Sequence, residues 1–389
     1  MIYDFDKAIE RRNTSSLKFD FTQDGGKPED AIPLWVADMD FRAPDCILDA
    51  LHEAVDHGIF GYTVKSKEYC DAVSAWFKAG FNWDTKDEWL ITTPGVVFAI
   101  SAAIRALTAP GDAVLIQPPV YYPFFGAIRD NNRRIVENQL IYKDGKYSID
   151  FTDFEQKIAE NGVKMFILCS PHNPVCRVWS TDELRRMGEI CKRYGVTVVS
   201  DEIHCDFVFP GHKHTMFPQA VPEMADNCVI CTSPSKTFNL AGMQISNIWV
   251  SNAEIRSKIE AEIYRCGYDE PNRLGLFACK AAYEKGRDWH EQCKAYMSGN
   301  LDYIRAFLSE NLPEIRLIEP EGTYFAWLDC SGLGLSPAEL NDLMLQKAKL
   351  WLDAGEIFGR CAEQFMRIVL ACPRSNIVKA MEQLKNALK

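Results

Sequence analysis

The sequence lacks any long hydrophobic run. No segment of the 389 residues reaches the roughly 18 unbroken apolar residues of a membrane span. The N-terminus, MIYDFDKAIERRN, has no apolar core of signal-peptide length. We therefore expect a cytoplasmic protein that does not interact with a membrane.

The chain also has little basic charge. It carries 43 Lys and Arg against 54 Asp and Glu, a formal net charge of −11. Nucleic acids and anionic membranes favour basic patches, so neither is expected as the main partner. An acidic surface can still enclose a locally basic pocket, so an anionic small ligand stays open.

Paired metal ligands and a disulfide framework are missing as well. The 14 cysteines are scattered through apolar segments, which indicates buried thiols in a reducing compartment. Cys228 and Cys231 have C-x-x-C spacing, but no second pair accompanies them and CVICTS predicts a buried strand. His212 and His214 flank a lysine in a loop bounded by Gly and Pro, which is typical of a solvated turn. We expect no metal site.

The middle of the chain alternates short apolar runs with helical periods. A capping box, Ser180 to Glu183, predicts the start of a helix that Gly195 ends. The apolar runs are nearly continuous, as expected for strands buried on both faces of a mostly parallel sheet. These runs are residues 113–119, 164–170, 196–202, 227–233 and 246–251.

The length and a change of rhythm predict two domains. After about residue 285 the pattern changes to longer amphipathic helices with a few strands, such as TYFAWLD at 323–329. We predict an α/β fold with a large domain at 46–285, a mostly parallel sheet with helices on both faces. A smaller α+β domain at 286–389 follows, and the N-terminal segment 1–45 is expected to pack with it.

Polar residues follow the predicted strands. In an open α/β sheet, ligands bind beyond the carboxyl ends of the strands, so these residues are candidates for a site. Each alone has a simpler explanation, because an Asp at a strand end is usually a helix cap and a loop Lys is usually solvated. They are Tyr121, Asn173, Asp201, Ser233 and Lys236.

Together these residues supply what pyridoxal 5′-phosphate (PLP) needs. The aldehyde of PLP needs an amine, which Lys236 offers in the apolar setting SPSKTFNLAG, where a Schiff base can form. The ring nitrogen needs a carboxylate, for which Asp201 is the candidate. Asn173 can donate to the phenolic oxygen, and Tyr121 can stack on the ring face.

A phosphate site is predicted before the apolar helix VVFAISAAIRAL. Gly95 precedes this helix, whose first amides, at Val96 and Val97, would be available to an anion. The hydroxyls of Ser233 and Ser235 lie close to Lys236 in sequence. The alternative explanation of Thr-Pro-Gly at 93–95 is a simple turn.

The chain resembles the fold-type I PLP-dependent enzymes of the class I/II aminotransferase superfamily. It is most similar to their cystathionine β-lyase (C–S lyase) branch, typified by the bacterial MalY and PatB proteins. The resemblance spans nearly the whole chain. It rests on LWVADMDF (34–41), FGYT (60–63), TTPGVV (92–97), PPVYYPF (118–124), SPHNPV (170–175), VVSDEIH (198–204), SPSKTFNLAGMQ (233–244) and MRIVLACPRS (366–375).

The resemblance implies the same cofactor roles and adds others. Gly95, Val96 and Ser233 match phosphate-binding positions. Tyr62 matches a tyrosine that reaches the phosphate of the neighbouring subunit, which implies a homodimer with shared active sites.

The resemblance also implies a substrate site. Arg367 matches the arginine that binds the substrate α-carboxylate, a task suited to its planar fork; the simpler explanation is a surface ion pair. Asn173 and the backbone of WVADMDF at Val36 and Ala37 would line the carboxylate pocket. Tyr122 is a further candidate for the substrate pocket.

Two positions favour a lyase over an aminotransferase. Aminotransferases of the superfamily commonly have tyrosine three residues after the aspartate and arginine eight residues after the lysine. This chain has His204, at a cofactor-contacting position, and Gln244. We therefore expect α,β-elimination from L-cystathionine or another sulfur-containing L-amino acid, with Lys236 as base. An aminotransferase using the same site is the first alternative, and a PLP-binding regulatory protein that acts through a partner is the second.

One residue departs from the family pattern. The family usually has N-P-x-G-R after the asparagine, whereas this chain has Cys176 in place of the glycine. If the glycine needs a positive φ, Cys176 strains the loop by about 1 kcal/mol or more. We expect the turn to adapt and Asn173 still to reach the cofactor.

Overall fold

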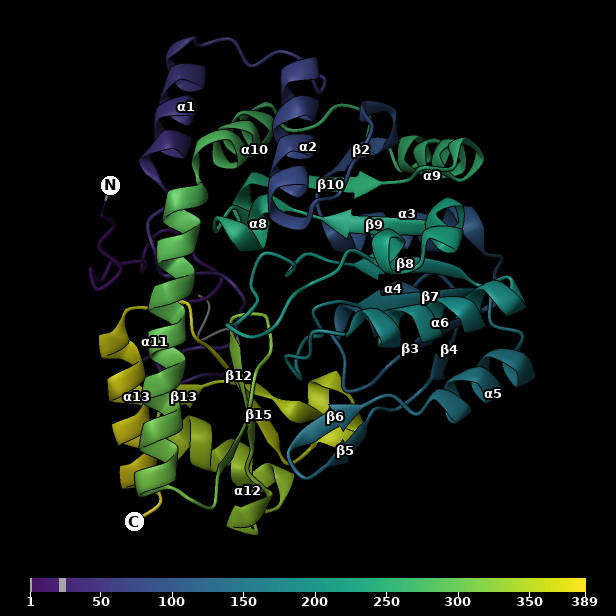
Figure 1. Ribbon diagram of the computed structural model, residues 1–389. Helices are drawn as coiled ribbons and strands as arrows, with labels where there is room; N and C mark the ends of the chain where they lie inside the picture. The colour runs from purple at the N-terminus through teal and green to yellow at the C-terminus, as the bar shows by residue number, and fades with distance from the viewer. Residues whose placement is uncertain (1, 21–25) are drawn as a thin grey trace.

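A seven-stranded sheet forms the centre of the large part of the molecule (Figure 1). The structure, a computed structural model, describes residues 2–20 and 26–389. The strands are parallel except β10, which runs antiparallel between β2 and β9. The expected α/β fold with a mostly parallel sheet is therefore confirmed. In spatial order the strands are β2 (Leu90–Thr93), β10 (Ser246–Trp249), β9 (Cys228–Thr232), β8 (Thr197–Asp201), β7 (Met165–Cys169), β3 (Ala113–Ile116) and β4 (Arg134–Glu137).

Successive residues of the central strands pack into different hydrophobic clusters. In β7, Met165 and Ile167 face one cluster, whereas Phe166 and Leu168 face the other. Side chains of a strand alternate between the two faces of a sheet, so the sheet is covered on both sides. One cover includes α3 (Val96–Leu107), α4 (Pro123–Arg129) and α9 (Ala253–Arg265). The other includes α2 (Lys67–Phe81), α5 (Phe151–Asn161), α6 (Thr181–Tyr194) and α10 (Arg273–Lys285).

A second, four-stranded antiparallel sheet lies towards the C-terminus of the chain (Figure 1). Its order is β11 (Arg316–Ile318), β12 (Phe325–Asp329), β15 (Phe365–Val369) and β14 (Asp353–Ala354). Its helices are α11 (Arg287–Asn311), α12 (Pro337–Asp342) and α13 (Arg374–Ala387).

The N-terminal segment contacts this second sheet and its neighbours. Strand β1 (Ile32–Pro33) pairs with β13 (Leu350–Trp351), and the Val369 amide donates to the Leu34 carbonyl. These contacts support packing of segment 1–45 with the C-terminal part, while the domain limits stay a prediction. The remaining α-helices and strands of the described residues are α1 (Asp45–Asp56), the hairpin β5 (Ile141–Lys143) and β6 (Lys146–Ser148), and the short helices α7 (Phe217–Ala220) and α8 (Pro234–Thr237).

Most local predictions are confirmed. Helix α6 begins with the capping box of Ser180 and Glu183 and ends at Gly195, whose φ is 67°. Cys228 and Cys231 are buried in β9. All cysteines are free thiols, and all are buried except Cys46, Cys266 and Cys361. Within residues 2–20 and 26–389, no helix is both long and apolar enough to cross a bilayer.

The prediction of a solvated turn is wrong for His214. His212 is exposed, but His214 is buried, and its Nε2 lies 2.6 Å from Oε2 of the buried Glu202. Burial follows from this pairing, because a carboxylate in the core needs a hydrogen-bonding partner. Neither residue belongs to a metal-binding group: no such cluster of His, Cys, Asp or Glu occurs in the described residues.

Candidate active site

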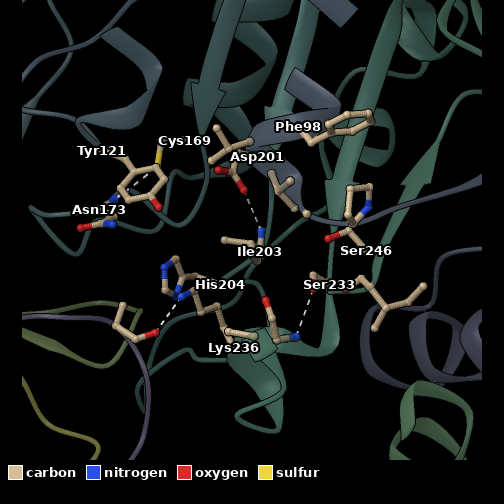
Figure 2. A pocket seen from close by; sticks show the side chains of 18 residues that line it. Phe98, Tyr121, Cys169, Asn173, Asp201, Ile203, His204, Ser233, Lys236 and Ser246 are labelled. Atoms are coloured by element: carbon tan, nitrogen blue, oxygen red, sulfur yellow. Dashed lines mark hydrogen bonds between the residues drawn. The ribbon is translucent and has the colours of Figure 1, made fainter. Parts of the chain in front are cut away.

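A cavity of about 210 Å³ lies where the parallel strands of the large sheet end (Figure 2). Most of the predicted site residues line it, although they come from segments far apart in the sequence. These are Ala37, Gly95, Val96, Val97, Tyr121, Asn173, Asp201, His204, Ser233, Ser235 and Lys236.

Lys236 belongs to α8, the short helix that follows β9. Its side chain is half-buried, and Nζ donates a hydrogen bond to the Ala37 carbonyl at 2.7 Å (Figure 2). Burial lowers the pKa of Lys236 to about 8, helped by Arg367 and opposed by Asp38 and Asp201. A lysine with this pKa is partly neutral near physiological pH, as a nucleophile or base must be.

Asp201 is the last residue of β8, and its carboxylate is buried beside the cavity. Oδ1 accepts the Ile203 amide at 3.2 Å. Burial raises the pKa of Asp201 to about 7, with a further rise from Glu202, while the Ile203 amide and Lys236 act in the opposite direction. A buried carboxylate with so little compensation fits a cationic ring nitrogen as its partner.

The N-terminus of α3 forms another wall of the cavity. Gly95 is the N-cap residue, and no side chain caps the first turn. Its φ of 178° is extended backbone, so the glycine is not required for its conformation; a Cβ there would meet only open space. The uncapped amides of Val96 and Val97 therefore border a space suited to an anion.

The two serines near Lys236 differ in their hydrogen bonds. The Ser233 hydroxyl accepts the Ser235 amide at 3.1 Å and donates to the Ile245 carbonyl at 2.8 Å. It therefore caps α8 and has little hydrogen-bonding capacity left. Ser235 also lines the cavity, and its hydroxyl makes no such pair of bonds.

Asn173, Tyr121 and His204 line the side of the cavity that lies towards the small sheet. The Asn173 carbonyl oxygen Oδ1 accepts a bond from Arg367 at 2.8 Å, which leaves its amide group for a ligand. Burial raises the pKa of Tyr121, so its hydroxyl stays protonated. Burial lowers the pKa of His204 well below its usual value, aided by Lys236 and Arg367, so the ring is neutral. Its Nδ1 is buried without a partner.

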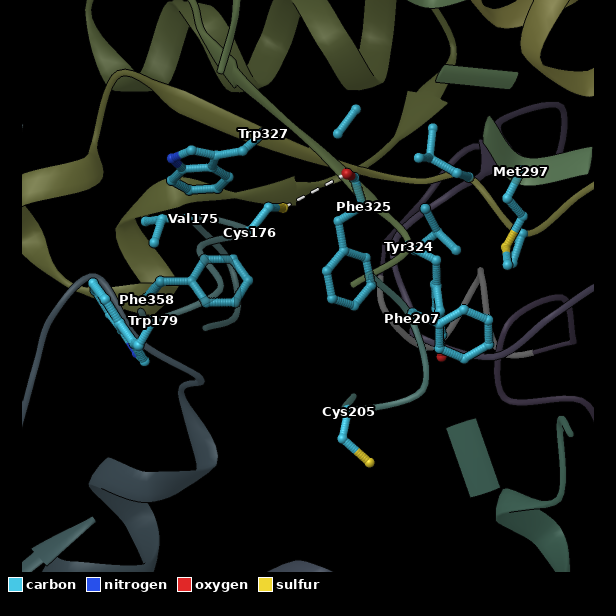
Figure 3. Close-up of a cluster of buried hydrophobic side chains, with 14 of the residues drawn as sticks. Val175, Cys176, Trp179, Cys205, Phe207, Met297, Tyr324, Phe325, Trp327 and Phe358 are labelled. Atoms are coloured by element: carbon cyan, nitrogen blue, oxygen red, sulfur yellow. Dashed lines mark hydrogen bonds between the residues drawn. The ribbon is translucent and has the colours of Figure 1, made fainter. Parts of the chain in front are cut away.

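Arg367 lies on β15 behind Asn173 and is buried, so the surface ion-pair explanation is wrong. Its guanidinium donates to the Trp35 carbonyl at 2.8 Å and forms an ion pair with Asp353 on the adjacent strand β14. The Phe325 and Phe358 rings lie 4.3 and 4.9 Å from its Cζ, and Figure 3 shows both rings in one cluster. These contacts fix the orientation of the guanidinium.

Four predicted residues do not line this cavity: Arg367, which lies behind Asn173, and three others. Tyr122 is partly exposed beside Phe358, and Val36 is half-buried, its carbonyl accepting the Asp38 amide. Tyr62 is 93% exposed between α1 and α2, so a single chain does not bring it to the site.

Sequence reasoning missed several lining residues and Asp353. Ser246 begins β10, which runs antiparallel, so its first residue lies at the edge where the parallel strands end. No sequence signal gave that direction. Cys169 ends β7 and Ile203 lies two residues after Asp201, so both could have been found by the same strand-end rule. The other missed residues are Pro94, Phe98, Ala241 and Ile245.

Cys176 does have the positive φ expected of the family glycine, at 60°. The loop is fixed by its carbonyl, which accepts the amides of Glu321 and Gly322. The thiol is buried and contacts the Phe325 carbonyl oxygen at 3.6 Å (Figure 3). Asn173 still reaches the cavity despite this substitution.

The chain belongs to the aminotransferase class I and II family, whose model matches residues 29–384. Among curated proteins it is 45% identical over 384 residues to the cystathionine beta-lyase PatB of Bacillus subtilis, covering 99% of each chain. It is 31% identical to the protein MalY of Escherichia coli, covering 100% of this chain and 99% of MalY.

Solved structures agree. Cystalysin from Treponema denticola, a structure that contains a pyridoxal 5′-phosphate cofactor, superposes with a TM-score of 0.97 at 39% identity, covering 100% of this chain and 99% of cystalysin. A PLP-bound C–S lyase from Staphylococcus hominis gives a TM-score of 0.93 at 34% identity, covering 100% of this chain and 98% of that one. The expected fold-type I architecture is thereby confirmed.

Proposed function

We propose that this protein is a PLP-dependent carbon–sulfur β-lyase. It converts L-cystathionine or a related cysteine S-conjugate to a thiol, pyruvate and ammonia. The observation that carries the proposal is the cavity itself, where a half-buried lysine and a buried carboxylate face one space at the sheet edge. Full-length similarity to a cystathionine β-lyase supports the choice of reaction.

The residues of the cavity fit the cofactor. Lys236 is the amine for its aldehyde, Asp201 the partner of its ring nitrogen, Asn173 the donor to its phenolic oxygen and Tyr121 its stacking residue. The α3 amides at Val96 and Val97, with Ser235, receive its phosphate. When bound, PLP supplies an electron sink for the electron pair left at Cα after deprotonation.

Lys236 acts as the general base. With a pKa lowered to about 8, its amine is neutral often enough to take the Cα proton. The Ala37 carbonyl orients Nζ through its hydrogen bond. The C–S bond then breaks, and the sulfur leaves with the bonding electron pair as a thiolate, which takes up a proton. Water completes the conversion of the remaining fragment to pyruvate and ammonia.

Arg367 binds the α-carboxylate of the substrate. Its Nε is buried without a partner, so the site holds an unmet donor. Asn173 fixes the guanidinium from one side and Asp353 from the other. Tyr122, exposed beside Phe358, borders the part of the pocket that receives the sulfur substituent.

The protein is a homodimer in which Tyr62 completes the site of the partner subunit. Segment 59–64 supports this, because four of its large apolar side chains are highly exposed in the single chain: Ile59 at 66%, Phe60 at 61%, Tyr62 at 93% and Val64 at 75%. Exposed apolar side chains gathered in this way mark an interaction surface. A cytoplasmic location stays a prediction.

The test is release of pyruvate and thiol from L-cystathionine by purified, PLP-loaded protein without a 2-oxo acid. We expect the two products in equal amounts. Formation of products only after a 2-oxo acid is added, with accumulation of the amine form of the cofactor, would instead establish an aminotransferase, the alternative that uses the same base.

A further inference from the structure

One short segment, residues 34–41, holds both cationic side chains of the site. The Ala37 carbonyl accepts Lys236 Nζ at 2.7 Å, and the Trp35 carbonyl accepts Arg367 at 2.8 Å. The Tyr324 hydroxyl also donates to the Ala37 carbonyl, at 3.1 Å. The position of this segment therefore fixes the position of the base and of the carboxylate-binding arginine together.

The segment is anchored on the side of Lys236 by Asn239, three residues further along the chain. Asn239 Oδ1 accepts the Met39 amide at 3.0 Å, and its Nδ2 donates to the carbonyls of Met39 and Phe41. On the opposite side, the Asp40 amide donates to the Ala371 carbonyl at 2.9 Å, just beyond the strand that carries Arg367.

Four charged residues, named here the N-terminal ionic latch, tie this segment to the start of the chain. They are Arg11, Lys18, Asp38 and Asp40. Arg11 lies 2.5 Å from Asp38 and 2.7 Å from Asp40, and Lys18 lies 2.9 Å from Asp40. The Lys18 side chain is 0% exposed, and among the described residues its charge is compensated by Asp40 at 2.9 Å and Asp38 at 3.4 Å.

We propose that Arg11 and Lys18 are positioning residues for catalysis: by holding Asp38 and Asp40 they place the Ala37 and Trp35 carbonyls on Lys236 and Arg367. The proposal rests on the proposed roles of those two residues. The latch carries two positive and two negative charges. The negative charge of Asp38 is therefore largely compensated within the latch, which weakens its effect on the site.

The electrostatic consequence concerns Lys236. The charged groups that act on it are Asp38, Arg367 and Asp201, and the neutral His204 also borders the cavity. Asp38 raises the Lys236 pKa and Arg11 compensates that charge. Loss of Arg11 should therefore raise the pKa of Lys236, whereas loss of the Asp38 charge should lower it.

The test compares Arg11→Met and Asp38→Asn with the wild type and with Arg12→Met. Arg12 is the matched control, because it is half-exposed, lies over the Phe19 ring, and among the described residues forms an ion pair only with Glu10, at 3.6 Å. The measurement is the pH dependence of Lys236 acylation by acetic anhydride in the full chain before PLP is added, followed by peptide mass spectrometry. We expect the pKa of Lys236 to rise by about half a unit in Arg11→Met, to fall in Asp38→Asn and to stay unchanged in Arg12→Met.

The decisive feature is that the pKa of Lys236 is expected to shift in opposite directions in Arg11→Met and Asp38→Asn. If the latch only kept water out, both variants would expose Lys236 and its pKa would rise in both, which would overturn the proposal. The same Lys236 pKa in the wild type and in all three variants would overturn the proposal as well. If Arg11→Met fails to fold, Arg11→Lys replaces it in the test. Lysine keeps the positive charge but lacks the two-pronged guanidinium, so a smaller rise in the pKa of Lys236 is expected.

The loaded enzyme gives a second readout. Arg11→Met should raise KM for L-cystathionine several-fold as well as lower kcat, because Arg367 loses its fixed position along with Lys236. An unchanged KM would contradict the link to Arg367. The acylation experiment needs neither cofactor nor substrate, so it stands whether or not the protein proves to be a lyase.

Discussion

Cys176 shows how a single residue can preserve a site while departing from its family. The backbone there has a φ of 60°, which costs a residue with a Cβ about 1 kcal/mol. The strain is tolerated because the thiol is buried and contacts the Thr323 hydroxyl at 3.3 Å and the Pro174 carbonyl. Glycine would relieve the strain but lose these contacts.

We therefore predict that Cys176→Gly changes the free energy of unfolding by less than about 1 kcal/mol, since the two effects offset each other. Cys176→Val should be destabilising by about 2 kcal/mol, because a β-branched side chain is poorly tolerated at positive φ. Urea unfolding of the two variants measures both changes. Equal destabilisation by the two would show that packing, not backbone strain, governs this position.

Asp201 makes the stability of the cofactor-free protein depend on pH. Burial raises its pKa from 3.8 to about 7, so the carboxyl binds a proton more tightly in the folded state. Its contribution to stability is therefore present below pH about 4 and is lost as the pH rises through about 7.

Asp201→Asn removes the loss of folding stability that the ionisation of Asp201 causes as the pH rises. The cofactor-free variant should be more stable than the wild type at pH 8, by up to about 4 kcal/mol, and the difference should shrink towards pH 5. Thermal unfolding across this range tests the prediction, with the exposed Asp130→Asn as control. Cofactor affinity should fall in the Asp201 variant at every pH.

At the scale of elements, the strand-end rule explains why the site was predictable. β7, β8 and β9 are short, apolar and parallel, so the residues that follow them meet at one edge, and Asn173, Asp201 and Lys236 were found in this way. The direction of β10 was not predictable, because an apolar run looks the same in either direction. Ser246 was therefore missed.

The loop after β8 was misjudged for a related reason. His212 and His214 are two residues apart and have similar neighbours in sequence, but only His214 meets the buried Glu202, which also accepts the Phe217 amide and the Ser200 hydroxyl. Pairing with a distant carboxylate leaves no local signal in sequence.

We predict that His214→Ala lowers the free energy of unfolding by about 3 kcal/mol, because it leaves a buried carboxylate without its imidazole partner. His212→Ala, in the same loop but exposed, should change it by less than about 0.5 kcal/mol. Denaturant unfolding of the pair provides the comparison. Similar small effects in both variants would mean that Glu202 is satisfied without His214.

At the scale of the whole molecule, the site is made by segments from both ends of the chain. Segment 34–41 and Arg367 on β15 meet Lys236 and Asp201 from the large sheet. The family resemblance located Arg367, whereas its pairing with Asp353 depends on the register of β14 and β15 and had no counterpart in the sequence pattern. Tyr62 belongs to a surface that one chain leaves exposed.

The proposed homodimer with shared sites can be tested by complementation. Lys236→Ala and Tyr62→Ala homodimers should both be less active than the wild type. The loss of activity should be far larger for Lys236→Ala than for Tyr62→Ala. In a mixed dimer, one of the two sites receives Lys236 from one subunit and Tyr62 from the other, so each mixed dimer should have about half the activity of a wild-type dimer. Random exchange of equal amounts makes about half of the dimers mixed, so the mixture should reach about a quarter of wild-type activity. No recovery despite exchange, followed by mass spectrometry of intact dimers, would contradict a shared site.

The central claim is that Lys236 carries the cofactor. The most direct measurement is borohydride reduction of the PLP-loaded protein, followed by peptide mass spectrometry to locate the pyridoxyl group. The account predicts one modified residue, Lys236, and no modification in Lys236→Ala. A pyridoxyl group on another lysine, such as the partly buried Lys65, with Lys236 unmodified, would contradict it.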